Sequence, residues 1–386
     1  MNKNLWLLTL SQIFSFTAAP ITVFLSGIIG SQITPIKSLA TLPMSTSIVG
    51  IAIGSIFASK VMSIIGRKNG FISASIGNSL ASILTAYSVM DQNFFLFCFS
   101  NFLIGFGMAF THQYRFAAAE SVDKSKAPKA ISIILLAGVF SAFIGPNLAN
   151  YTKEIFNEHL YVGSYLSLAV VTFIPTVLFS FYDNAAKLKV NIKYSGRSYL
   201  ELILQPRFLQ AIIAAAFGYA IMTFLMTATP ISMHILEKIS LTKTSVVIQL
   251  HIVAMFLPSL ITGNLIKKYG HSNIMYAGVF LFSISITASF LDQTFINYLF
   301  ALIFLGLGWN FLFISGTSLL VLTYREKEKF KAQGFNDFIV FSIHAIASLV
   351  AGILLSMIGW KSINLVCIPF LLLILISTYR ADLASK

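Results

Sequence analysis

The residues best suited to chemistry form a short polar run inside a long apolar stretch. They are Thr111, His112, Gln113, Tyr114 and Arg115. On a helix, residues three and four apart are neighbours, so Thr111, His112 and Arg115 would share one face. A guanidinium beside a hydroxyl and an imidazole can bind a carboxylate or a phosphate in bidentate fashion. The run therefore predicts a solute-binding site with Arg115, His112 and Thr111 as contacts.

Arg115 has two interpretations. An arginine inside a bilayer costs about 2.5–3.5 kcal/mol on insertion scales, so it normally faces a polar cavity or a partner. The alternative is that the apolar stretch ends near Thr111 and that Arg115 is an anchor at the inner membrane surface. Residues 116–119 continue the apolar helix before Glu120, which favours the cavity. We expect Arg115 to bind the negative charge of a solute.

Further polar side chains lie inside other apolar stretches. Histidine is a candidate for proton coupling because its unperturbed pKa is about 6.5. A lone histidine among apolar residues is more often a packing residue, and a threonine often bonds only its own helix. The candidates for proton coupling are His112, His251 and His344. The further candidates for solute binding are Gln12, Tyr219, Thr223, Thr227 and Asn310.

Carboxylates fall at the ends of the apolar stretches, and none is expected in the middle of one. Asn336 and Asp337 are expected to begin a helix at the inner surface, where such side chains cap helices. Transporters that bind a cationic solute and a proton alternately usually need a buried acid in the site. A site with Arg115 but no acid should repel cations, so we expect an anionic, zwitterionic or neutral organic solute. Cys98 and Cys367 lie inside apolar stretches, so neither a disulfide nor a metal site is expected.

The elements that must position these residues are long apolar segments. The 386-residue chain is 57% hydrophobic and only 10% charged, whereas about a quarter of the residues of a soluble chain are charged. Apolar runs of about 20 residues are long enough to cross a bilayer as helices. The sequence predicts an all-α membrane protein with twelve spans, at roughly 5–29, 39–60, 69–90, 94–119, 130–150, 161–182, 208–230, 246–266, 272–291, 295–323, 336–359 and 362–379.

The distribution of positive charge predicts the orientation. The net charge of +13 comes from Lys and Arg in connections between spans, which is a topological use of charge and not a nucleic-acid-binding stripe. We expect a multi-pass protein of a bacterial-type inner membrane with both termini cytoplasmic and the first span retained. All but five of the 26 Lys and Arg residues then lie inside, the exceptions being Lys37, Lys153, Lys238, Lys243 and Lys361.

The two halves of the chain repeat each other at a nearly constant offset. Because both halves begin on the inner side, the repeat predicts two six-helix bundles related by a pseudo-twofold axis along the membrane normal. We predict an N-terminal half at 1–182, a cytoplasmic linker at 183–207 and a C-terminal half at 208–386. The matching segments are Thr17–Ile21 with Thr227–Ile231, Asp91–Phe94 with Asp292–Phe295, Gly105 and Gly107 with Gly306 and Gly308, and Gly66 with Gly270.

With these features the chain resembles the major facilitator superfamily over essentially its whole length. In the strings around Met226–Pro230, Ile248–His251 and Ala332–Phe338 it also resembles a poorly characterised bacterial group. The run Gly66-Arg67-Lys68 is similar to the end of the family's signature after span 2, whereas Ser59 and Ser63 replace its first Gly and its Asp. Asn101 stands where the span 4 motif has Arg. Gly145-Pro146 in span 5 is similar to the Gly-Pro motif that is typical of the antiporter branch. The resemblance implies gating or structural roles for Gly66, Arg67, Lys68, Gly145, Pro146, Gly263 and Gly270.

The resemblance implies a secondary transporter of a small organic solute, in which two halves rock around a central site. We expect it to be proton-linked and to act as a monomer. A drug or metabolite efflux antiporter is the alternative, and a transporter-like sensor or assembly partner without turnover is an alternative of another class. No phosphate-binding loop, HExxH string or pair of mid-span carboxylates occurs in the sequence, so neither ATP driving nor an enzyme is expected. We expect no cofactor, metal or nucleic-acid partner.

Overall fold

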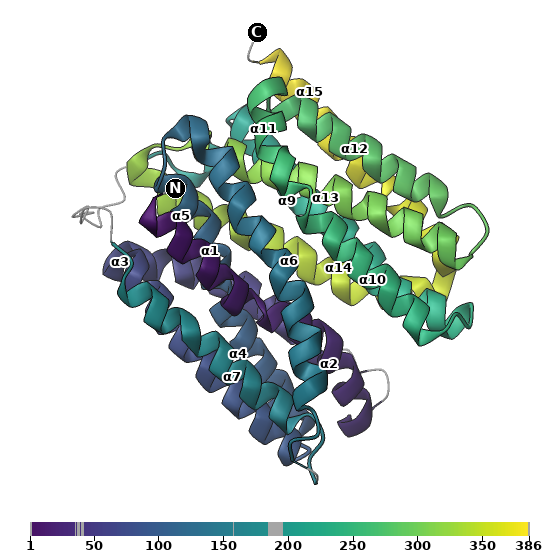
Figure 1. Ribbon diagram of the computed structural model, residues 1–386. Coiled ribbons are helices and arrows are strands. Elements are labelled where there is room, and N and C mark those ends of the chain that lie inside the picture. Colours follow the sequence, from purple (N-terminus) through teal and green to yellow (C-terminus); the bar gives the residue numbers. More distant parts are fainter. Residues whose placement is uncertain are drawn as a thin grey trace. The chain divides into compact units, whose positions relative to one another are not determined.

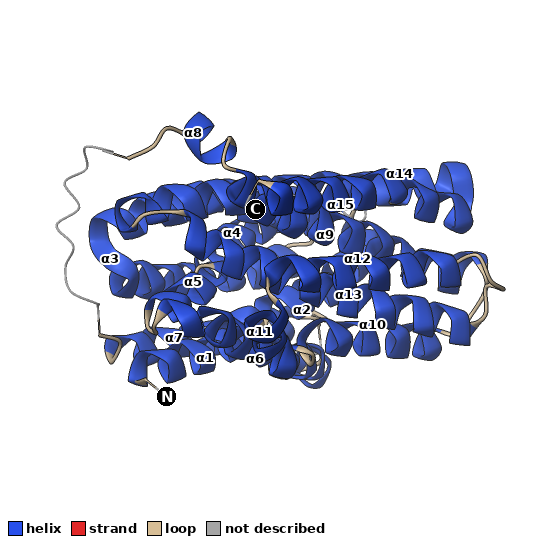
Figure 2. Cartoon of the chain, turned by 90° about the horizontal axis from the view of Figure 1, so that it is seen from above, coloured by secondary structure: helices blue, strands red, loops and turns tan. Residues whose placement is uncertain are grey.

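The structure of the protein, a computed structural model, describes residues 2–34, 36, 39, 42–156, 158–183 and 196–384. Its regular secondary structure is helical, and the described residues contain no strand (Figure 2). The expected all-α class is therefore confirmed. Some basic residues used for the orientation and the linker lie outside the described residues, namely Lys37, Lys187, Lys189, Lys193 and Lys386.

The described part of the chain supplies the twelve expected spans. Ten segments are long and apolar enough to cross a membrane. One of them, α3 (Leu42–Met90), contains two helices joined at Gly66, and α12 (His271–Ala288) occupies the predicted ninth span. The other nine segments are Lys3–Val23, Phe94–Glu120, Lys124–Thr152, Val162–Ser180, Pro206–Pro230, Val246–Tyr269, Phe295–Thr323, Glu326–Ala351 and Met357–Leu383.

Contacts within the chain divide it into two compact units. Two helices, α6 (Ala127–Thr152) and α14 (Lys329–Val366), contribute residues to both. The predicted linker over 183–207 stays a prediction, because residues 184–195 lie outside the described part. The first unit comprises Met1–Val122, Ala137–Tyr194 and Gln333–Phe341, and the second comprises Asp123–Leu136, Ser195–Ala332 and Ser342–Lys386.

In the first unit, α3 packs against α4 and α7, and α1 packs against α5 and α7 (Figure 1). The first span is broken at Thr17, between α1 and α2, and the fourth at Gln113, between α4 and α5. The helices are α1 (Lys3–Phe16), α2 (Ala18–Ile33), α4 (Phe94–His112), α5 (Tyr114–Glu120) and α7 (Val162–Ser180).

In the second unit, α13 is the central helix and packs against α9, α10 and α12, while α15 covers α9 and α12 (Figure 1). A π-helix over Ile231–Leu236 follows α9. Short 3₁₀ turns at Lys124–Lys126 and Glu326–Glu328 precede α6 and α14. The remaining helices are α8 (Tyr199–Ile203), α9 (Pro206–Pro230), α10 (Leu241–Phe256), α11 (Ser259–Tyr269), α13 (Phe295–Thr323) and α15 (Ile368–Leu383).

Equivalent helix crossings in the two units use the matched glycines. A Cβ at Gly105 would overlap the carbonyl oxygen of Ser47, and one at Gly306 would lie 2.7 Å from the carbonyl oxygen of His251. Ser47 and His251 are separated in sequence by nearly the same number of residues as these two glycines. The repeat seen in the sequence is therefore present as a repeated close approach of helices.

Three turns between helices depend on a glycine with positive φ. The backbone angles are φ 81° and ψ 168° at Gly66, φ 85° and ψ 162° at Gly270, and φ 74° and ψ 172° at Gly359. Only glycine adopts this combination without steric cost. Gly66 and Gly270, for which the resemblance implies gating or structural roles, lie at two of these turns, whereas the sequence did not single out Gly359.

The end of the linker segment is held to the turn before α14. The guanidinium of Arg197 donates to both carboxylate oxygens of Glu328, at 3.0 and 2.5 Å, and to the carbonyl oxygen of Thr323 at 3.1 Å. This hydrogen bond to Glu328 raises the pKa of Arg197. A capping box between Ser198 and Glu201 then starts α8.

Candidate solute and coupling sites

Arg115 lies in α5, the short helix that follows the break at Gln113. Its side chain is only 2% exposed. Its Nη2 donates to Oδ1 of Asp337, whose side chain is completely buried. Arg115 is therefore buried inside the first unit, and its charge is paired with a carboxylate of the chain itself.

Asp337 is placed differently from the expectation that it begins a helix at the inner surface. α14 begins at Lys329, so Asp337 lies more than two turns inside it. Besides Arg115, Gln113 Nε2 donates to its carboxylate at 2.8 Å and Asn336 Nδ2 at 2.9 Å. The expectation that no acid neutralises Arg115 is therefore wrong. Hydropathy places a span boundary at polar residues, whereas polar residues that pair with one another can continue the helix.

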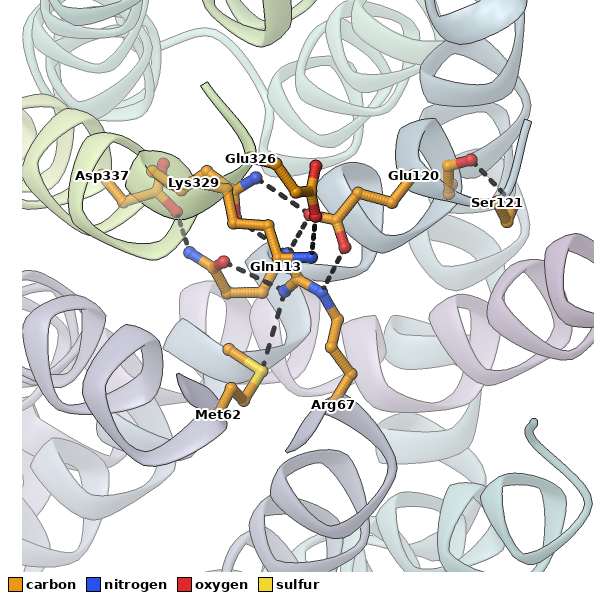
Figure 3. A network of polar contacts seen from close by, with 10 residues as sticks. Met62, Arg67, Gln113, Glu120, Ser121, Glu326, Lys329 and Asp337 are labelled. Atoms are coloured by element: carbon orange, nitrogen blue, oxygen red, sulfur yellow. Dashed lines mark hydrogen bonds and ion pairs between the residues drawn. The ribbon is translucent and has the colours of Figure 1, made fainter. Parts of the chain in front are cut away.

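Arg67 joins a second carboxylate to the same group of side chains. Its Nε and Nη2 lie 3.0 and 2.5 Å from the two oxygens of Glu120. Its Nη1 donates to Gln113 Oε1 at 3.4 Å, so the Gln113 amide bridges Arg67 and Asp337 (Figure 3). Gln333 Oε1 accepts from Arg67 at 2.8 Å, and Gln333 Nε2 donates to Glu120 at 3.1 Å.

We name this group of six residues the polar network, and its two arginines and two carboxylates balance in charge. Such a network is stable only while its members satisfy one another. Ser63, which replaces the acid of the family signature, is half-buried and donates to the carbonyl oxygen of Lys60 at 2.7 Å. The acids of the network come from α5 and α14 instead. Its members are Arg67, Gln113, Arg115, Glu120, Gln333 and Asp337.

Thr111 and His112 lie at the end of α4, immediately before the break. Thr111 is buried, and His112 is half-buried. The ring centroid of His112 lies 4.4 Å from that of Phe341 and 6.0 Å from that of Phe16. Phe341 is one turn beyond Asp337 in α14, so His112 and Arg115 both contact the same segment of that helix.

Tyr219 belongs to an aromatic cluster in the second unit. Its ring centroid lies 5.3 Å from Trp309, 5.4 Å from Phe313 and 4.6 Å from His344. Trp309 also stacks on Phe313, with centroids 4.8 Å apart and an interplanar angle of 15°. The structure thus brings two predicted residues, Tyr219 and His344, together with Trp309 and Phe313. We name these four residues the aromatic cluster.

Trp309 was not singled out from the sequence, although it directly follows the matched glycine Gly308. Its side chain is 1% exposed. Among the described residues, its Nε1 has no hydrogen-bond acceptor. A buried indole N–H usually has a partner, so Trp309 is a candidate to donate to a bound solute.

Asn310 has a packing role in the second unit. Its Nδ2 donates to the carbonyl oxygen of Met255 at 2.6 Å and to Ser259 Oγ at 2.8 Å. Its Oδ1 accepts from Thr262 Oγ1 at 2.6 Å. Both ends of the amide are thus engaged by residues of α10 and α11, which holds α13 against these helices.

The other predicted solute contacts lie in different units. Gln12 is buried in the first unit, whereas Thr223 is buried and Thr227 half-buried in α9 of the second. Within the described part of the chain, Gln12 Oε1 and Thr227 Oγ1 have no hydrogen-bond partner. Their assignment as solute contacts stays a prediction.

His251 is completely buried where α10 crosses α13. Its Nδ1 donates to the carbonyl oxygen of Leu302 at 2.7 Å. Its Nε2 meets no hydrogen-bond partner among the described residues. His112, His251 and His344 thus lie in three different surroundings, and the role of each in proton coupling stays a prediction.

Two of the residues expected to gate or to shape the fold make close contacts in the first unit. A Cβ at Gly145 would lie 2.7 Å from the side chain of Pro20, so α6 approaches the broken first span there. Pro146 follows inside α6. Lys68 Nζ donates to the carbonyl oxygen of Ser180 at 2.5 Å.

At two further helix crossings, a glycine on one helix faces a serine on the other. A Cβ at Gly263 in α11 would lie 2.8 Å from Ser132 Oγ in α6. In the first unit, a Cβ at Gly334 in α14 would lie 2.6 Å from Ser59 Oγ in α3. Ser59 occupies the position where the family signature has glycine, and Gly334 on the facing helix makes room for it.

Comparisons with known proteins agree with this architecture. A profile of the Major Facilitator Superfamily matches residues 5–248 and 226–384. The riboflavin transporter RfnT of Brucella anthropi is 34% identical over 376 residues, which cover 97% of this chain and 94% of that protein. The uncharacterized MFS-type transporter YdeG of Bacillus subtilis is 26% identical, with 94% of this chain and 88% of that protein covered.

Two solved structures share the fold. The MFS transporter FucP in the outward conformation has a TM-score of 0.74 at 17% identity, covering 98% of both chains. The human organic anion transporter MFSD10 has a TM-score of 0.75 at 11% identity, covering 97% of this chain and 99% of that chain. Identities this low show a common fold and do not identify a solute.

Proposed function

Because the chain belongs to the major facilitator superfamily and is a multi-pass secondary transporter, we propose that its solute is a small neutral heteroaromatic compound, with riboflavin as the first candidate. The observation that carries this proposal is the similarity to the riboflavin transporter RfnT over nearly the whole chain. A neutral solute was among the classes expected from the sequence.

The aromatic cluster supports a flat, aromatic solute. A flavin ring stacks favourably on aromatic side chains, and Tyr219, Trp309 and His344 provide three rings within a small region. The buried Nε1 of Trp309 would donate to a ring carbonyl or ring nitrogen of the solute. Thr223 and Thr227 of α9 are the further contacts in this proposal, and Gln12 of the first unit stays a separate candidate.

The structure removes the main argument for an anionic solute. That argument rested on an arginine with no acid to neutralise it, whereas Arg115 is paired with Asp337. We therefore assign Arg115 to the polar network and propose that it does not contact the solute. Proton linkage, action as a monomer, an inner-membrane location and cytoplasmic termini complete the proposal.

The test is counterflow in proteoliposomes. Vesicles loaded with unlabelled riboflavin should take up labelled riboflavin in a saturable way, whichever direction the protein works in the cell. Lumichrome, which has the flavin ring without the ribityl chain, should compete, whereas the charged flavin mononucleotide should not. Counterflow of an anionic compound, with none of riboflavin, would show that the neutral-solute proposal is wrong.

A matched pair of tryptophan variants tests the site. Trp309→Phe keeps the stacking surface but removes the N–H, so the affinity for riboflavin should fall roughly five- to tenfold, the value of one hydrogen bond. Trp6→Phe is the control, because Trp6 is 52% exposed. Riboflavin affinity that is unchanged in Trp309→Phe would remove Trp309 from the solute site.

A further inference from the structure

Asp337 stands apart among the carboxylates of the chain. Only two acidic side chains are buried among the described residues, Glu328 and Asp337. Glu328 lies in the 3₁₀ turn before α14, where Arg197 and two backbone N–H groups hold it. Asp337 is the one that lies well inside a helix. Capping of a helix end therefore does not explain a buried carboxylate in the interior of α14.

The groups around Asp337 all donate to it. Arg115 Nη2, Gln113 Nε2 and Asn336 Nδ2 point their hydrogens at its two oxygens. Three donors, one of them charged, favour the ionised carboxylate. Without these donors, a carboxylate among apolar helices is favoured in its protonated form. The protonation of Asp337 is therefore linked to whether α14 stays beside α4 and α5.

The segment of α14 that carries Asp337 contacts α3 and α4 at further residues. Residues 333–341 belong to the first unit, while the rest of the helix belongs to the second. Gln333 contacts Arg67, Gly334 contacts Ser59, and Phe341 contacts His112. Two turns beyond Asp337 along α14 lies His344 of the aromatic cluster. A displacement of this helix would therefore reach both the network and the proposed solute site.

We propose that Asp337 is the proton-binding group of the transport cycle. It is ionised while Arg115 and Gln113 donate to it, and it takes a proton from water when α14 leaves these partners. The proton adds to one carboxylate oxygen and is lost again when the pair with Arg115 forms. This inference rests on the proposed proton-linked transport. The other charged and titratable groups facing this part of the network are Arg67 on α3, His112 on α4, and Arg115 and Glu120 on α5.

The first experiment compares accumulation with exchange in proteoliposomes, with riboflavin as the probe. A pH gradient of about one unit drives roughly tenfold accumulation when one proton moves with each solute molecule. The ratio of gradient-driven accumulation to counterflow should fall roughly tenfold in Asp337→Asn, and its pH profile should become flat. Counterflow lost together with accumulation would overturn the proposal, because Asp337 would then be structural.

The matched control is another Asp–Arg pair. Asp382 accepts from Arg207 at 2.9 Å and is 30% exposed. Asp382→Asn should keep the wild-type pH profile. His112→Gln, His251→Gln and His344→Gln are run beside it. A profile that is flattened by one of these histidine variants and not by Asp337→Asn would also overturn the proposal.

The second experiment needs no solute, so it tests the protonation of Asp337 even if riboflavin is not transported. Infrared difference spectra of the purified protein are recorded as the pH is lowered. A carbonyl band of a protonated carboxylic acid should appear in the wild type, shift in Asp337→Glu and be missing in Asp337→Asn. If Asp337→Asn does not purify as a monodisperse species, Arg115→Gln/Asp337→Asn replaces it, since it removes both charges. A wild-type band that persists in the variant would show that another acid binds the proton.

Discussion

At the scale of single residues, Arg115 and Asp337 constrain each other more than either constrains a solute. Both are buried, and each supplies the opposite charge that makes the other tolerable inside the fold. The sequence indicated that Arg115 is internal and needs a partner. It did not reveal that the partner is a residue of the same chain.

The pairing predicts that the second of two substitutions restores stability that the first removes. Arg115→Gln leaves the Asp337 carboxylate buried without its arginine, which should cost about 3–5 kcal/mol of stability. The double variant Arg115→Gln/Asp337→Asn removes both charges and should recover most of that loss. Thermal unfolding of the purified variants in detergent measures both effects. A double variant as unstable as the sum of its single variants would contradict the pairing.

At the scale of elements, glycines decide where spans turn and where they approach. Gly66 and Gly270 turn the chain between helices through a positive φ. Gly105 and Gly306 instead allow close crossings. The sequence singled out Gly66 and Gly270 through the resemblance to the family signature. It could not predict which helix each close approach would face.

Gly270 offers a direct test of backbone strain. Nothing lies within 4 Å of a Cβ at Gly270, so only its φ of 85° opposes a side chain. Gly270→Ala should therefore cost about 1–3 kcal/mol. Gly77→Ala is the control, since Gly77 lies in a helix and also has open space around its Cβ. There the change should stabilise by about 0.5–1 kcal/mol. Equal melting temperatures for the two variants would contradict this account.

The crossing of α3 and α14 predicts a compensating swap. Gly334→Ser should weaken the crossing, because its Cβ would lie 2.6 Å from Ser59 Oγ. Ser59→Gly/Gly334→Ser recreates the arrangement seen at Gly263 and Ser132 and should restore stability and transport. The coupling in a double-mutant cycle should be about 0.5–3 kcal/mol. Additive effects of the two substitutions would mean that the two side chains do not meet.

At the scale of the whole molecule, the repeat and the charge distribution predict how the chain crosses the membrane. Most Lys and Arg residues occupy the connections expected to be cytoplasmic. Both native cysteines, Cys98 and Cys367, are buried. Single cysteines introduced into connections can therefore be labelled against a low background.

The orientation is tested with two exposed positions. Glu154→Cys lies in a connection expected outside, and Lys268→Cys in one expected inside. A maleimide that does not cross membranes should label Glu154→Cys in intact spheroplasts and Lys268→Cys only after the membrane is opened. The opposite labelling pattern would reverse the proposed orientation.

By itself, the sequence determined the class of protein, the twelve spans and the internal repeat, and it singled out Gly66 and Gly270, two of the three glycines with positive φ. Each of these follows from local properties, namely the hydropathy of a segment or the φ that a single residue must adopt. The tertiary structure decided which polar groups meet. Asp337 lies 222 residues from Arg115 in the sequence. Hydropathy placed Asp337 at a span boundary because a hydropathy scale treats every charged side chain as exposed to water. Inside the fold, an opposite charge and two amide donors replace water, and the pattern of a single segment cannot show where on the chain those groups lie.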